Sequence, residues 1–166
     1  MIAEHGASDD DVAAVARQLG RTPAGRFRVV VRRRDGRPVV IENAPWLEDG
    51  TPMPTTLWLV DEDLVRQVAT LESEGGVRRM ERMVDPDGLA AAHAAYAARR
   101  DALGDGRAGP APRGGVGGTR RGVKCLHAHL ANHLCGYVDP VGALVADEVD
   151  VGEVVPSVPV RDRLSG

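Results

Sequence analysis

Histidine and cysteine are concentrated in residues 125–135, which hold three of the five histidines and both cysteines. If this segment is a helix, Cys125, His129 and His133 fall within roughly 80° on one face, because successive residues are about 100° apart. A thiolate followed by two imidazoles at successive turns is a ligand set suited to zinc. The spacing predicts a metal site that takes its fourth ligand from elsewhere. The alternative is a polar helix face with an incidental thiol.

Cys125 also has the setting of a catalytic thiol. It is expected in the first turn of the helix, directly after Lys124 and close to two arginines. The positive end of a helix and neighbouring cations favour thiolate over thiol, and an adjacent histidine can serve as its base. The alternative is that Cys125 packs beneath the sheet as a small hydrophobic residue.

A glycine-rich run, residues 114–122, leads into this helix and carries Arg120 and Arg121, with Lys124 just beyond it. Free N–H groups at a helix start, beside these cations, predict a site for a small anionic ligand. The phosphate loop of nucleotide hydrolases needs Gly-Lys-Ser/Thr at its end and a strand before it. Here valine and Lys124 follow the last glycine, so the run predicts general anion binding only.

Two irregular segments flank the Cys/His-rich helix, which is predicted over residues 123–135. Residues 104–122 contain eight glycines and two prolines, a composition typical of a mobile loop. From residue 147 onward, acids, valines and prolines alternate without a period, which predicts an extended or disordered tail over 147–166. Residues 1–146 are expected to form one domain.

A small antiparallel sheet is predicted from the first half of the chain. Residues 26–33 and 38–41 read as strands joined at Asp35 and Gly36, a dipeptide favoured in two-residue type I′ turns. A third strand is expected over residues 55–60, around Trp58. The first helix, residues 8–20, is thus followed by a strand, which excludes a helix-turn-helix DNA-binding motif.

Helices account for most of the remaining sequence. Besides the first, capped by Ser8, helical spacing predicts segments over residues 61–75, 77–83 and 85–103. Together with the last helix they give an α+β fold, in which four to five helices pack on about three strands. His93 falls on the packing stripe of the fourth segment and is expected to be partly buried and hydrogen-bonded.

Composition narrows the function classes. A net charge of -3 lacks the basic excess of a protein held to nucleic acid by phosphate contacts, so nucleic acid is an improbable partner. There is no apolar stretch long enough for a signal peptide or a membrane span. The sequence therefore predicts a cytoplasmic protein with no membrane partner, whose two cysteines form no disulfide.

Four short segments, in order, carry a resemblance to the domain of unknown function 501 family of small actinobacterial proteins. They are residues 49–59 (DGTPMPTTLWL), 71–75 (LESEG), 123–128 (VKCLHA) and 139–142 (DPVG). The resemblance implies that Cys125 and His127 are the functional pair, at a helix start where regular spacing does not apply. His129 and His133 are then secondary candidates. It implies no particular activity.

The sequence therefore favours a ligand- or metal-binding domain, with zinc as the metal, whose site lies where the glycine-rich loop meets the last helix. A thiol-dependent or metal-assisted enzyme using Cys125 is the first alternative. A protein-interaction module without chemistry is the second.

Overall fold

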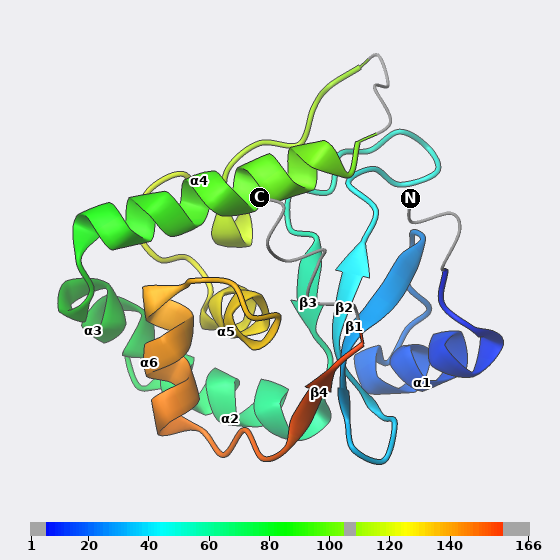
Figure 1. Ribbon diagram of the computed structural model, residues 1–166, viewed down its shortest axis with the longest axis horizontal. Helices are drawn as coiled ribbons and strands as arrows, with labels where there is room; N and C mark the ends of the chain where they lie inside the picture. The colour runs from blue at the N-terminus through cyan, green and yellow to red at the C-terminus, as the bar shows by residue number, and fades with distance from the viewer. Residues whose placement is uncertain (1–5, 105–108, 158–166) are drawn as a thin grey trace.

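The computed structural model describes residues 6–104 and 109–157. Within them it has six α-helices, one 3-10 turn and four strands (Figure 1). None of the described helices is long and apolar enough to cross a membrane. In chain order the elements are α1 (Asp9–Leu19), β1 (Phe27–Arg33), β2 (Pro38–Asn43), β3 (Leu57–Leu59), α2 (Glu62–Ser73), α3 (Gly76–Met83), α4 (Pro86–Ala102), η1 (Val116–Gly118), α5 (Leu126–Leu134), α6 (Pro140–Glu148) and β4 (Val154–Pro156). The predicted α+β class is confirmed.

The strands form one antiparallel sheet in the order β3-β2-β1-β4. The β1–β2 hairpin lies where the sequence predicted it, but its turn is longer than two residues. The Arg33 N–H donates to the Arg37 carbonyl, and Gly36 takes a φ of 92° while Asp35 does not take a positive φ. A type I′ turn needs positive φ at both central residues, so the chain uses a three-residue turn that ends at glycine.

The sheet is covered on both faces. Helix α1 packs on one face, where Val15 meets Phe27, Val29 and Ile41 in a small apolar cluster. The remaining helices lie on the opposite face, over the larger core (Figure 1). Because both faces are covered, every residue of β2 is buried.

Most helices begin at a residue whose side chain accepts a hydrogen bond from the first turn. These caps are Ser8, Asp61, Asp85 and Asp139. They satisfy N–H groups that have no partner within the helix. Helix α5 has no such cap, because its first flanking residue is Cys125. Its N-terminus must therefore be satisfied from another part of the fold.

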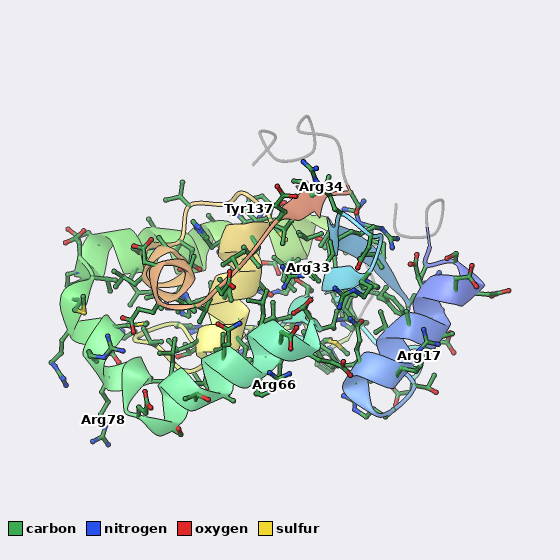
Figure 2. All side chains as sticks on the ribbon, turned by 90° about the horizontal axis from the view of Figure 1, so that it is seen from below. Arg17, Arg33, Arg34, Arg66, Arg78 and Tyr137 are labelled. Atoms are coloured by element: carbon green, nitrogen blue, oxygen red, sulfur yellow. The ribbon has the colours of Figure 1, made fainter. Side chains whose placement is uncertain are left out.

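Helix α5 lies at the centre of the helical layer, between α4 and α2 and against α6 and β3 (Figures 1 and 2). Six of its nine residues are buried, and two of these six, His129 and Asn132, are polar. Buried polar groups destabilise a fold unless they find hydrogen-bond partners. The elements around α5 therefore have to supply those partners.

The C-terminal part holds two elements that the sequence interpretation lacks. Helix α6 begins at the pair Asp139 and Pro140, the same cap-and-proline signal that correctly placed the start of α4 at Asp85 and Pro86. Strand β4 is only three residues long and pairs with the edge of β1, so it has no period to detect. The rest of the expected tail, 158–166, lies outside the described residues.

Two further differences concern the segment before α5. The helix begins at Leu126, three residues later than predicted, since Cys125 is extended with φ −149° and ψ 118°. The glycine-rich segment, expected to be a loop without packing, lies against α4 in its second half, where Val116 is fully buried. Residues 105–108 of that segment lie outside the described residues.

Tyr96 of α4 joins this helix to the start of β3, and its removal tests the packing. Its buried hydroxyl accepts hydrogen bonds from the N–H groups of Thr56 (2.8 Å) and Leu57 (3.0 Å). Tyr96→Phe leaves both groups without this acceptor, so we expect the free energy of unfolding in urea to fall by roughly 2–4 kcal/mol. Tyr137→Phe, at a half-buried tyrosine, is the control. Equal losses in the two variants would contradict this role of Tyr96.

Candidate functional site

The N-terminus of α5 is capped by a carboxylate from another helix. Glu72, in the last turn of α2, accepts a hydrogen bond from the Leu126 N–H at 2.7 Å through Oε1. This contact provides the acceptor that the Cys125 side chain does not provide. It also places a negative charge at the positive end of the helix.

His127 faces the same carboxylate. Its Nδ1 lies 3.2 Å from Glu72 Oε1 and 3.9 Å from Cys125 Sγ, while its Nε2 lies 3.1 Å from the carbonyl oxygen of Val65. A carbonyl only accepts, so we assign a hydrogen to Nε2. The ring is thereby oriented with Nδ1 toward the thiol and the carboxylate.

The surroundings of His127 favour its protonated form. Burial alone lowers the pKa of His127, but the hydrogen bonds to Cys125 and to the Val65 carbonyl, with the charge of Glu72, outweigh burial. Together they raise the pKa from 6.5 to about 9. At neutral pH the imidazole is therefore protonated on Nδ1 and can donate a hydrogen bond to Glu72 and Cys125.

Glu72, Cys125 and His127 form the only group of three metal-ligand side chains found within residues 6–104 and 109–157. One ligand atom from each lies within 4.8 Å of the other two. The side chains of His127 and Glu72 are 24% and 29% exposed, and Cys125 is half-buried. A solute can therefore reach this group, which we call the Glu–Cys–His cluster.

The structure does not bring Cys125 together with His129 and His133. Cys125 lies outside the helix, so the 100° spacing that aligned the three residues does not extend to it. His129 is fully buried, with Nδ1 2.9 Å from Asp139 Oδ1. His133 packs against α6, where a Cβ atom added to Gly142 would lie 2.6 Å from the Cβ atom of His133.

His129 belongs to a buried network that joins α5 to α6. Burial raises the pKa of Asp139, but the hydrogen bonds from His129, Gly142 N–H and Asn132 outweigh burial and lower it. Asp139 is therefore ionised, and His129 donates through Nδ1. The Asn132 oxygen in turn accepts from Arg99 at 2.7 Å. This network satisfies Asn132 and the Nδ1 atom of His129, and its position indicates a structural role, while the buried Nε2 atom of His129 has no hydrogen-bond partner among the described residues.

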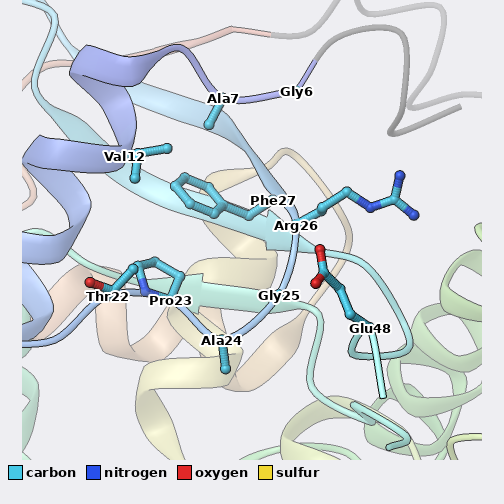
Figure 3. Close-up of a pocket in the computed structure, with 10 residues that line it drawn as sticks. All are labelled: Gly6, Ala7, Val12, Thr22, Pro23, Ala24, Gly25, Arg26, Phe27 and Glu48. Atoms are coloured by element: carbon cyan, nitrogen blue, oxygen red, sulfur yellow. The ribbon is translucent and has the colours of Figure 1, made fainter. Parts of the chain in front are cut away.

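The predicted anion ligands separate into two groups. Arg120 and Arg121 line cavities between α4 and the glycine-rich segment. Lys124 is exposed and lines neither of them. Another cavity, of about 470 Å³, lies beneath α1 around Phe27 (Figure 3). The described residues that line this other cavity include no cysteine or histidine.

Sequence reasoning missed Glu72, the third member of the cluster. It lies 53 positions before Cys125 along the chain, so no local spacing links the two. A signal was nevertheless present, because Glu72 lies in the segment LESEG that carries part of the family resemblance. Asp139, which holds His129, lies in another of these segments, DPVG.

The pH dependence of stability tests the environment of His127. A histidine with a raised pKa stabilises the folded state below its unfolded pKa of about 6.5, and this contribution is lost as pH rises toward about 9. We expect wild type to exceed His127→Gln in free energy of unfolding by roughly 1–3 kcal/mol at pH 6, after allowance for solvent screening. The difference should shrink as the pH approaches 9.

The control for this measurement is His133→Gln, on the same helix and outside the cluster. The free energy of unfolding of His133→Gln should depend on pH in the same way as that of the wild type. Parallel profiles for wild type and His127→Gln would contradict the assignment of a stabilising proton to His127.

Comparisons with known proteins bear on the whole chain. Neither a curated protein nor a solved structure matches it. The sequence profile described as "Protein of unknown function (DUF501)" matches residues 29–147. This span includes the whole Glu–Cys–His cluster, its Val65 contact and the four segments noted in the sequence. Since the match extends over more than half of its length, the chain belongs to the DUF501 family.

Proposed function

We propose that this protein binds a zinc ion through Glu72, Cys125 and His127, with one coordination position open to solvent. The observation that carries the proposal is the convergence of a sulfur, a nitrogen and an oxygen atom within 4.8 Å of one another. Three protein ligands and an open position are typical of zinc sites that act on a substrate.

The ligand types favour zinc over other common ions. Magnesium and calcium prefer oxygen ligands, whereas thiolate and imidazole suit zinc and other transition metals. Metal-binding histidines usually donate their second ring N–H to a carbonyl or carboxylate. The contact of His127 Nε2 with the Val65 carbonyl, at 3.1 Å, supplies such a partner.

The local charges support the same proposal. A thiol, an imidazole nitrogen and a carboxylate face one another, and all three can act as acceptors. A proton shared by Nδ1 can hold them together, and so can a cation that replaces this proton. Cys125 and Glu72 are partly exposed, so an ion can enter without opening the fold.

A zinc ion with an open position can lower the pKa of a bound water, which is the basis of metal-assisted hydrolysis. In that role Glu72 and His127 would hold the ion, and Cys125 would be its third protein ligand. We assign this function to the cytoplasm, a reducing compartment in which a thiol such as that of Cys125 persists.

A thiol-dependent enzyme is the second candidate. It is favoured by the 3.9 Å separation of Cys125 Sγ and His127 Nδ1 at the start of a helix. A thiolate and an imidazolium held in this way form the pair used by cysteine nucleophiles. In this case Glu72 orients the histidine.

Zinc titration of protein without a histidine tag tests the proposal. We expect one zinc ion per chain by isothermal calorimetry and by metal analysis after dialysis. Cys125→Ser should weaken binding by more than the roughly 10–100-fold that is typical for loss of an outer partner, because it removes a direct ligand. His127→Gln and Glu72→Gln should also weaken it.

Cys135→Ser is the matched control, since Cys135 is buried at the opposite end of α5. It should leave zinc affinity unchanged. Absence of stoichiometric zinc binding to the wild type would contradict the proposal. If Cys125 then reacts with iodoacetamide faster than Cys135, the thiol-dependent enzyme becomes the better account.

A further inference from the structure

The glycine-rich segment crosses α4 (Figure 1). Two adjoining cavities lie between the segment and this helix. Their volumes are about 380 and 280 Å³, and both are lined by Ala90, His93 and Arg120. We call the two together the α4 trough. Even without the smaller cavity, the volume of the larger one falls in the size range of small-molecule sites. None of the three residues of the Glu–Cys–His cluster lines the trough.

Small residues leave the trough open. Ala90, Ala94 and Ala97 follow one stripe of α4 and form its floor. The backbone of Gly115 passes so close to α4 that a Cβ there would lie 2.6 Å from His93 Cβ. Only glycine permits this approach. The alanine floor is therefore apolar and carries no long side chain, while Arg113 and Arg120 line the same cavity.

Two side chains of α4 hold the segment in place. His93 accepts from the Val116 N–H through Nδ1 at 3.1 Å, and its Nε2 lies 2.9 Å from the Gly122 carbonyl. Burial lowers the pKa of His93, in keeping with the neutral ring that these two bonds require. Arg100 donates to the Gly114 carbonyl at 2.5 Å. The segment that carries Arg120 is thus fixed at both ends before any ligand arrives.

The charges at the trough are mostly positive. Arg113 and Arg120 line the larger cavity and Arg121 lines the smaller one, and all three are exposed. Among the described residues, none of the three has an acid within ion-pair distance. The acids at the trough are Asp101, which pairs with Arg100, and Glu81.

We propose that the α4 trough binds an organic phosphate. Guanidinium groups present paired N–H donors that match phosphate oxygens. Two guanidinium groups together match a doubly charged phosphate better than they match a singly charged carboxylate. In this arrangement Arg113 and Arg120 hold the phosphate, and the alanine floor contacts the apolar part of the ligand. Both nitrogens of His93 are occupied by the backbone, so His93 positions the segment and does not bind the ligand.

Phenyl phosphate serves as the probe because it joins a phosphate to a small apolar body. Calorimetry at constant ionic strength should show that it binds more tightly than inorganic phosphate or benzoate. Arg120→Gln and Arg113→Gln should each weaken it by about tenfold, which corresponds to the loss of a charged hydrogen-bonding partner. Ala94→Leu, at an exposed helical position, should weaken phenyl phosphate binding and leave inorganic phosphate binding unchanged.

Arg17→Gln is the control, because Arg17 lies on α1 at the far side of the sheet (Figures 1 and 2). It should bind phenyl phosphate as the wild type does. Equal weakening by Arg17→Gln would mean that the protein attracts phosphate only through its general charge, and would overturn the proposal. Equal or tighter binding of benzoate would overturn the assignment to phosphate. Melting temperatures without ligand establish that each variant is folded.

Discussion

The fold is organised around the need to satisfy the polar groups of its central helix. Helix α5 is nine residues long and has the sheet, α2, α4 and α6 around it. Its N-terminus has no cap of its own, and its buried face carries His129 and Asn132. Helix α5 itself supplies no partners for these groups, so the partners that they have come from neighbouring helices. Glu72 of α2 serves one end, and Asp139 at the start of α6 serves the buried face.

The N-terminal end and the buried face of α5 therefore acquire different chemistry. His127 and His129 are only two residues apart, yet the side chain of His127 is 24% exposed and that of His129 is fully buried. At the exposed end, a thiol, an imidazole and a carboxylate meet where solutes can reach them, which is why we propose metal binding there. In the interior, the carboxylate of Asp139 is fully used by neighbouring donors, and its role is to hold two helices together.

Local patterns in the sequence were sufficient for much of the fold. The first helix, the start of α4 and the hairpin were predictable because each depends on a local signal. These signals are Ser8, Asp85 and Gly36, which affect only the few residues next to them in the chain. The partnership of Glu72 with Cys125 was not, because it joins helices far apart in the chain. The predicted alignment of Cys125, His129 and His133 on one face required a regular helix. The backbone at Cys125 is extended, so this residue is not aligned with the other two. Packing of the glycine-rich segment depends on His93, whose partners are backbone groups that no sequence pattern identifies.

The central claim is that Glu72, Cys125 and His127 bind one zinc ion together. X-ray absorption at the zinc edge, on wild-type protein loaded with one equivalent, tests it most directly because it counts the sulfur ligands. We expect one sulfur at about 2.3 Å and the remaining ligands, nitrogen and oxygen, at about 2.0 Å. The sulfur shell should vanish in Cys125→Ser and persist in Cys135→Ser. A first shell without sulfur in the wild type, or a sulfur that survives Cys125→Ser, would contradict it.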